Sequence, residues 1–235
     1  MEDLIYLFCD YFIMVTSKNV DARNYSLWRN FLMDTPKSYS QWFADEKVYL
    51  DRHIDSDGNV LDVGCGEGRS LRYLLDKNLS LYGIDHNLFA IREGRDRLVG
   101  RENVTMMIGD ARDICFRDGF FDYVLAISVP ANFGKHKAKI YSEMSRVLKP
   151  NGELVLSCYN NESETFRERM RVYESIGAPI EKVEGTTVFI KSRDEDWISE
   201  QYSREKLGMD LDKNGFVSVD MIKEGIGLFC RARKK

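Results

Sequence analysis

The hydrophobic positions of the chain recur with two alternating periods from residue 59 onward. Short apolar runs rich in β-branched residues predict strands, whereas apolar residues three or four positions apart predict helices. We expect strands at residues 59–64, 79–84, 104–108, 120–127 and 153–159. Helices are expected between them, at residues 67–77, 87–99 and 135–148. This alternation is typical of βαβ units, which build a parallel sheet covered by helices on both faces.

The end of the chain departs from this alternation. After a last helix come two apolar runs, residues 216–222 and 226–232, separated only by Lys223, Glu224 and Gly225. So short a link joins antiparallel neighbours, because a parallel pair needs a crossover of about a dozen residues or more. The pattern therefore predicts a doubly wound, mostly parallel α/β sheet that ends in an antiparallel hairpin.

Two further segments lie outside the alternation. Residues 1–58 are rich in aromatic residues and begin with an apolar run, Leu4 to Val15, which is too short to span a membrane. We expect that run to fold back as a core element, with a dimer contact as the alternative. Because helical lids and long insertions in compact folds are often functional, we interpret residues 1–58 as a helical cap over a core of residues 59–159.

The second segment, residues 160–205, lies between the fifth predicted strand and the last helix. A charged stretch at 164–175 predicts a helix, and two runs at 186–191 and 197–202 flank the polar turn Arg193–Asp196 and predict a hairpin. We interpret this insertion as the other part of a substrate cap, after which residues 206–235 complete the core sheet.

Composition and charge exclude several classes of protein. The hydrophobic fraction of 43% is that of a globular domain, and a formal net charge of −4 gives no electrostatic signature of binding to nucleic acid or to an anionic membrane. The five cysteines are scattered and have no metal-ligand spacing, which predicts a reduced, cytoplasmic protein without a disulfide framework or a metal site. The acidic start, Met1-Glu2-Asp3, does not resemble that of a signal peptide.

The strongest chemical signal is the turn Asp62-Val63-Gly64-Cys65-Gly66-Glu67-Gly68 between the first strand and helix. Glycines there let the backbone pass close to a ligand, and the helix start beyond presents N–H groups suited to a carboxylate or phosphate. Asp85 ends the second strand and Asp110 follows the third. Taken singly, the glycines could serve only a tight turn, and each aspartate could serve only as a helix cap. Their placement at three successive carboxyl edges predicts a nucleotide-like ligand, with Asp85 on its ribose.

Five segments carry a resemblance to a known family: LDVGCGEG, YGIDHN, GDARD, FDYVLAIS and YSEMSRVLKPNGELVLS. Together they cover roughly residues 59–159 and resemble the class I S-adenosylmethionine-dependent methyltransferases. The resemblance implies a Rossmann-like sheet of seven strands, S-adenosylmethionine as the cofactor, S-adenosylhomocysteine as the product, and no metal. It says little about the methyl acceptor.

The resemblance also implies roles for the matching positions. The amino-acid end of the cofactor and its methyl group would be contacted by Asp62, Gly64, Cys65, Gly66, Gly68, Ile127 and Ser128. The ribose and the adenine would be contacted by Asp85, His86, Asn87, Asp110 and Ala111.

No catalytic group stands out in the sequence. Methyl transfer from a sulfonium depends mainly on alignment, and a general base helps only when the nucleophile must lose a proton. The candidates are His136 and Ser128, and a surface or helix-start role is as plausible for His136. Aromatic residues expected to form the lid or to line the acceptor site are Tyr39, Trp42, Phe133, Tyr159 and Tyr202.

We expect the acceptor to be a small or medium-sized molecule methylated on O or N, because the chain is acidic and has no separate nucleic-acid-binding module. A tRNA or protein acceptor and a non-catalytic S-adenosylmethionine-binding subunit are the alternatives. The segment at 128–133 lacks the Asn/Asp-Pro-Pro-aromatic run of many amino-nitrogen methyltransferases, the Cys nucleophile of cytosine-C5 enzymes, and acidic residues of the kind an aminopropyl transferase uses. A nicotinamide dehydrogenase expects glycine where this chain has Arg69.

Overall fold

The main feature of the fold is a seven-stranded sheet with the strand order β3-β2-β1-β4-β5-β10-β9. The structure is a computed structural model that describes residue 31 and residues 35–191 and 197–235. The five parallel strands are β1 (Asp57–Val63), β2 (Asn78–Asp85), β3 (Val104–Ile108), β4 (Phe121–Ile127) and β5 (Leu148–Tyr159). The last two strands, β9 (Phe216–Glu224) and β10 (Gly227–Lys234), form the predicted antiparallel hairpin, and β10 pairs antiparallel with β5. The predicted fold class is confirmed.

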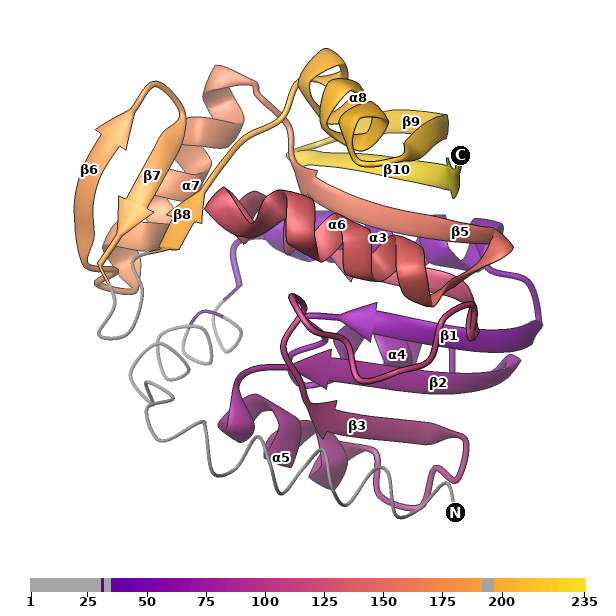
Figure 1. Cartoon of the computed structure of the whole chain (residues 1–235). Helices are drawn as coiled ribbons and strands as arrows, with labels where there is room; N and C mark the ends of the chain where they lie inside the picture. The colour runs from indigo at the N-terminus through magenta and orange to yellow at the C-terminus, as the bar shows by residue number, and fades with distance from the viewer. Residues whose placement is uncertain (1–30, 32–34, 192–196) are drawn as a thin grey trace.

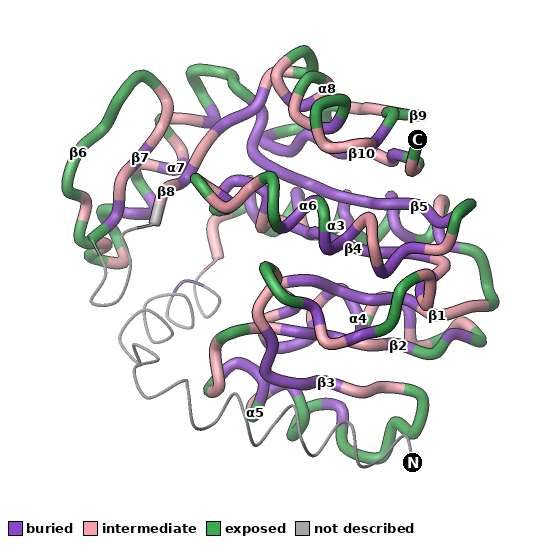
Figure 2. The backbone as a smooth tube through the Cα atoms, in the orientation of Figure 1, coloured by how far each residue is buried: buried purple, intermediate pink, exposed green. Residues whose placement is uncertain are grey.

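Helices cover both faces of this sheet (Figure 1). One face carries α3 (Lys37–His53), α4 (Arg69–Tyr73) and α5 (Leu88–Arg97), and the other carries α6 (Lys137–Val147) and α8 (Arg204–Lys213). Neighbouring residues of a strand point to opposite faces, so Val60 of β1 packs into the first core layer and Leu61 into the second. The central strands are therefore buried on both sides, as the continuous apolar runs predicted (Figure 2).

Several boundaries differ from the prediction. The helix α4 has only five residues instead of the predicted 67–77, because the chain turns at Leu74 to reach the start of β2 at Asn78. Two short 3-10 turns, Pro130–Asn132 and Gly134–His136, precede α6, which begins at Lys137. The strand β5 begins at Leu148, before the Pro/Gly segment, which forms an irregular pairing with β4.

The insertion after β5 folds into α7 (Ser163–Ser175) and a small antiparallel sheet of β6 (Ile180–Glu184), β7 (Thr187–Ile190) and β8 (Trp197–Ser199). Figure 1 shows this unit on the side toward which the arrows of β1 and β2 point. The predicted helix and the pairing of β7 with β8 are confirmed, although β8 ends three residues earlier than expected. The sequence did not predict β6, because its residues are almost all exposed and show no apolar alternation.

Some predictions fall outside the described residues. These are the apolar run Leu4–Val15 and the turn Arg193–Asp196. In the part of residues 1–58 that the structure describes, α3 packs into the core, and β1 begins at Asp57, two residues earlier than expected. The role of residues 1–58 and 160–205 as a cap stays a prediction. None of the described helices is long and apolar enough to cross a lipid bilayer.

The packing of α3 on the sheet depends on a glycine in β10. A Cβ atom built at Gly227 would lie 2.5 Å from Nε1 and 2.6 Å from Cδ1 of Trp42, which is 2% exposed. We predict that Gly227→Ala forces Trp42 out of place and lowers the free energy of unfolding by about 1–3 kcal/mol. Urea denaturation measures this change.

Gly208→Ala is the matched control, because Gly208 lies within α8 and an added Cβ atom meets nothing within 4 Å. Alanine is the better helix former, so this variant should gain about 1 kcal/mol or less. Equal unfolding free energies for the two variants would show that α3 is not held against Gly227.

Candidate functional site

The glycine-rich turn after β1 lies beside the end of β2. The backbone N–H groups of Gly64 and Cys65 both donate to the carbonyl oxygen of Ile84, at 2.8 and 3.0 Å. Gly64, Gly66 and Gly68 have φ angles of 76°, 52° and 76°, which side-chain-bearing residues rarely adopt. A Cβ atom at Gly64 would lie 2.7 Å from Cγ1 of Val129, whereas one at Gly66 would meet nothing within 4 Å. The turn is thus closed on the side of β4 and open above Gly66, where a ligand can approach the backbone.

Asp62 lies beneath this turn and is 1% exposed. Neither of its carboxylate oxygens accepts a well-formed hydrogen bond from the described residues, although the Ser70 hydroxyl lies near enough to favour the charged form. Burial raises the pKa of Asp62 to about 7, although the nearby Arg69 and Ser70 oppose the rise. A buried carboxylate without a partner is costly, and a cationic ligand group would relieve that cost. Asp62 therefore fits the ammonium group of an amino-acid ligand.

Asp85 is held by backbone donors on both sides. The N–H of Gly66 donates to Oδ2 at 2.9 Å, and the N–H of Asn87 donates to Oδ1 at 2.8 Å. One carboxylate thereby fixes the glycine turn and the start of α5 together, and each oxygen keeps a second lone pair for a ribose hydroxyl. The neighbouring His86 side chain is 87% exposed, and the Asn87 side chain caps α5 by accepting from the N–H groups of Phe89 and Ala90.

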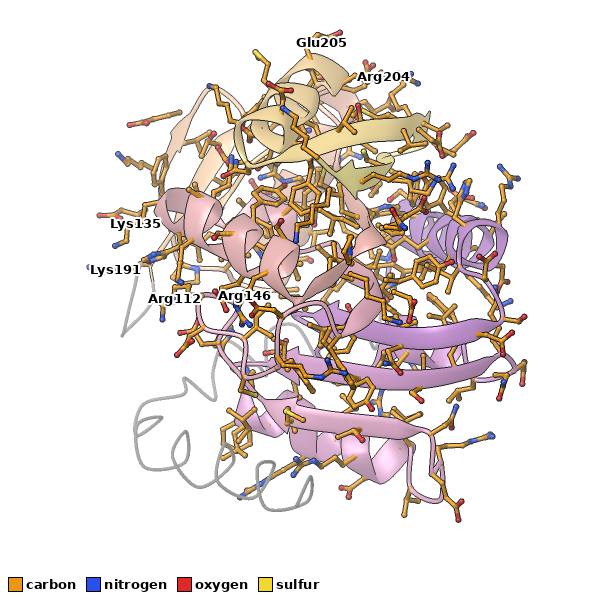
Figure 3. All side chains as sticks on the ribbon, turned by 45° about the vertical axis from the view of Figure 1, so that its right-hand side comes forward. Arg112, Lys135, Arg146, Lys191, Arg204 and Glu205 are labelled. Carbon is orange, nitrogen blue, oxygen red and sulfur yellow. The ribbon has the colours of Figure 1, made fainter. Side chains whose placement is uncertain are left out.

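Asp110, predicted to contact adenine, is engaged by a neighbour. Arg112 forms an ion pair with its carboxylate at 2.7 Å and donates further hydrogen bonds from Nε and from its backbone N–H. Burial raises the pKa of Asp110, but the hydrogen bonds from Arg112 outweigh burial and hold that pKa below its usual value. Arg112, labelled in Figure 3, also lies 3.4 Å from Nε2 of His136. The structure thus joins Asp110 and His136 through one arginine, beside the partly buried Ala111.

A buried carboxylate from α3 completes the edge of the sheet. Glu46 is 1% exposed, and its Oε1 accepts hydrogen bonds from the hydroxyls of Ser128 at 2.7 Å and Ser157 at 2.6 Å. Its Oε2 forms an ion pair with Nη1 of Arg69. These donors come from the ends of β4 and β5 and from the start of α4, so Glu46 ties the helical layer to three strand-end segments.

Ser128 adopts an unusual conformation at this junction. Its φ of 64° is the only positive value at a non-glycine residue among the described residues. The Ser128 N–H donates to the Ser157 hydroxyl at 2.9 Å and to the Ser157 carbonyl oxygen at 3.0 Å, and both contacts hold the strained turn. Strained residues of this kind cluster at functional sites, but the cofactor contacts of Ser128 and of the adjacent, buried Ile127 stay predictions.

The predicted lid residues fall into two groups. Tyr39 and Trp42 of α3 contact Tyr159 at the end of β5, with ring centroids 6.1 and 4.9 Å from it, and all three are buried. Phe133 and Tyr202 belong to the core layer under α6 and α8, where the Tyr202 hydroxyl donates to the Pro130 carbonyl oxygen. The structure brings Tyr39, Trp42 and Tyr159 together and places the other two in a separate layer.

Three polar residues of the site were not predicted from sequence: Glu46, Arg69 and Ser157. Two of them carry a visible signal. Glu46 lies on the same helical face as Trp42 and Tyr49, so a charged residue interrupts an otherwise apolar stripe. Ser157 interrupts the apolar run of β5. Arg69 carries no such signal, because an arginine after a glycine turn is ordinary on a helix surface.

The described residues hold no cluster of metal-ligating side chains. Cys65 is buried, and burial raises the pKa of its thiol well above the usual value, so it packs as a small apolar group beside Gly83.

Comparison with known proteins identifies the family. A model of the methyltransferase domain matches residues 54–205. The demethylmenaquinone methyltransferase of Staphylococcus aureus is 28% identical over 189 residues, which cover 74% of this chain and 74% of that protein. A solved structure from Pyrococcus horikoshii OT3 has 25% identity and a TM-score of 0.67, and covers 86% of this chain and 93% of its own.

A structure of a SAM-dependent methyltransferase from Aquifex aeolicus shares the fold at 19% identity, with a TM-score of 0.63 and coverage of 87% of this chain and 96% of its own. The domain model spans well over half of the sequence and includes the glycine turn and both strand-end aspartates. The chain therefore belongs to the methyltransferase domain family and is an S-adenosylmethionine-dependent methyltransferase.

Proposed function

We propose that this methyltransferase transfers the methyl group of S-adenosylmethionine to an O or N atom of a small or medium-sized acceptor. The observation that carries the cofactor site is the unpartnered, buried carboxylate of Asp62 beneath the open backbone at Gly66. When bound, the cofactor supplies an activated methyl group on a sulfonium. The residues of the chain then have to bind, orient and exclude water.

Each part of the cofactor has matching groups at the carboxyl edge. Asp62 is proposed to pair with the ammonium group, with Gly64, Gly66 and Gly68 leaving room for the amino-acid end. Asp85 would accept hydrogen bonds from the ribose hydroxyls through its remaining lone pairs. Because Arg112 neutralises the Asp110 carboxylate, we propose that adenine is bound mainly by backbone groups at residues 110–111 and beside His86 and Asn87.

The acceptor is proposed to bind between the loop after β4 and the two cap segments. The insertion is tied to that loop, since the N–H of Glu200 donates to the Ala131 carbonyl oxygen at 2.9 Å, and a Cβ atom built at Gly134 would lie 3.3 Å from Cγ1 of Ile198. The aromatic group of Tyr39, Trp42 and Tyr159 is buried, so we propose that it supports the acceptor site from the core rather than lining it. The name of the Staphylococcus aureus relatives also refers to a small-molecule acceptor.

The two candidate catalytic residues, Ser128 and His136, are both engaged by other side chains, which agrees with a reaction driven by alignment. The Ser128 hydroxyl donates to the Glu46 carboxylate, and Nε2 of His136 lies 3.4 Å from Nη1 of Arg112. We therefore propose that Ser128 positions the methyl site and that an acceptor with a readily lost proton needs no base from the chain.

A radiolabel assay tests the acceptor class. The purified protein is incubated with S-[methyl-¹⁴C]adenosylmethionine and, in parallel, with a small-molecule extract, total tRNA and a protein fraction. We expect label in the small-molecule extract, recovered on O or N. Label in the tRNA or protein fraction would contradict the proposed small-molecule acceptor and identify the true class of acceptor. Binding of the cofactor without transfer to any fraction would favour a non-catalytic subunit.

Asp85→Ala tests the ribose contact. We predict that affinity for S-adenosylhomocysteine falls about 10- to 100-fold, because hydrogen bonds to a charged group are lost together with the support of the glycine turn. Calorimetric titration measures the affinity, and Asp76→Ala, at an exposed position in the link between α4 and β2, is the control. Unchanged affinity in Asp85→Ala would show that the ribose binds elsewhere.

The raised pKa of Asp62 predicts a pH-dependent stability. The ordinary value is 3.8, so between about pH 4 and pH 7 the folded protein keeps a proton that the unfolded chain has released. The stability contributed by this group is therefore present at low pH and lost as the pH rises through about 7. Relative to Asp62→Asn, which stays neutral, the wild type should lose free energy of unfolding across this range in urea denaturation.

The same group predicts how cofactor binding depends on pH. If the ammonium group pairs with ionised Asp62, wild-type affinity for S-adenosylhomocysteine should rise up to tenfold per pH unit below about pH 7 and level off above it. Asp62→Asn should bind weakly at every pH. A wild-type affinity that is flat from about pH 5.5 to pH 8 would remove Asp62 from the ammonium site.

A further inference from the structure

We propose that Arg69 binds the carboxylate of the cofactor's methionine part, and that Glu46 occupies Arg69 as an internal carboxylate until the cofactor arrives. The inference rests on the proposed cofactor site and assigns a role to two residues that the resemblance did not include. It also makes α3, which carries Glu46, a competitor of the cofactor rather than only a cover.

The environment of Arg69 suits a planar anion. Its side chain is 22% exposed, and its guanidinium carbon lies 4.0 Å from the centroid of the Phe43 ring, a cation–π contact that restrains the group. Nη1 pairs with Glu46, and Nη2 lies 3.5 Å from the hydroxyl of Ser128, on the methyl side of the site. A guanidinium group is planar and presents its N–H groups in the fork that a carboxylate accepts.

The charges around the turn match a zwitterion. Asp62 lies within electrostatic range of Arg69, which opposes the rise of its pKa, and of Glu46, which adds to that rise. An α-amino acid group carries one positive and one negative charge on the same carbon. Asp62 offers an unpartnered negative site and Arg69 a positive one, so the two residues together complement both charges.

Glu46 stands where a ligand carboxylate would be needed. It is fully buried and accepts from Arg69, Ser128 and Ser157, so Arg69 is neutralised in the protein without a ligand. Its Oε1 contacts to the two serines do not involve Arg69, and they can persist when Oε2 releases the guanidinium. The exchange of one carboxylate for another keeps Arg69 paired throughout, which avoids the cost of a buried, uncompensated charge.

Competition between Glu46 and the ligand carboxylate predicts the direction in which ligand affinity changes when Glu46 is replaced. Removing the internal carboxylate by Glu46→Gln should lower the melting temperature of the empty protein and tighten S-adenosylhomocysteine binding about tenfold. An orienting role for Glu46 predicts the opposite, because Arg69 would then lose its alignment and the ligand would bind more weakly.

The direct test compares two ligands that differ only in the carboxylate: S-adenosylhomocysteine and S-adenosyl-3-thiopropylamine. We expect the wild type to bind the first at least about tenfold more tightly. Arg69→Met should lose affinity only for S-adenosylhomocysteine and so bind the two ligands equally. Arg69→Lys should discriminate between the ligands less than the wild type and more than Arg69→Met. Arg72→Met, on the exposed side of α4, and Asp45→Asn, at the surface of α3, are matched charge controls.

The outcomes separate this inference from the cofactor assignment. Equal binding of the two ligands by the wild type, discrimination that survives in Arg69→Met, or weaker binding by Glu46→Gln would overturn the carboxylate exchange and leave the cofactor site standing. Absence of binding by both ligands to the wild type would overturn the cofactor site and this inference together. Circular dichroism and the melting temperature of each variant establish that the chain is folded.

Discussion

The buried carboxylate of Glu46 is the interaction on which the carboxyl edge of the sheet depends. Through one side chain it connects α3 to the ends of β4 and β5 and to the residue that follows the glycine turn. Buried ion pairs contribute little to net stability, yet removal of one partner costs about 3–5 kcal/mol because a charge is left uncompensated. The pair is therefore better understood as a device that fixes the geometry of the edge than as a source of stability.

A second polar cluster attaches the insertion to the opposite face. Lys137 of α6 contacts Glu200 at 3.1 Å and Asp210 of α8 at 2.6 Å, and Lys206 of α8 contacts Glu200 at 3.1 Å. The ammonium groups of both lysines lie over the Tyr202 ring, at 5.1 and 4.5 Å from its centroid. The loop after β4 is thus held between Glu46 on one face and the Glu200 cluster on the other, and it contacts both the carboxyl edge of the sheet and the insertion.

Much of the fold was predictable because its signals are local. The alternation of apolar runs identified the parallel strands, and the short link at Gly225 identified the closing hairpin. Asp85 was predictable as well, since its position follows from the end of a strand. The role of Glu46 was not predictable, because it depends on hydrogen bonds to Ser128 and Ser157, which lie 82 and 111 residues away in the chain. The length of α4 and the exposed strand β6 were missed because tertiary geometry rather than residue pattern determines them.

The distance in sequence between Glu46 and its partners has a consequence for how the protein folds. During synthesis α3 emerges from the ribosome well before β4 and β5, so its acidic side chain lacks both of its serine donors until those strands have been made. Long-range contacts of this kind are costly in loop entropy and form late. The helix is therefore expected to dock only when the centre of the sheet is complete, and the edge that binds the ligand is a product of the last stage of folding rather than of the first.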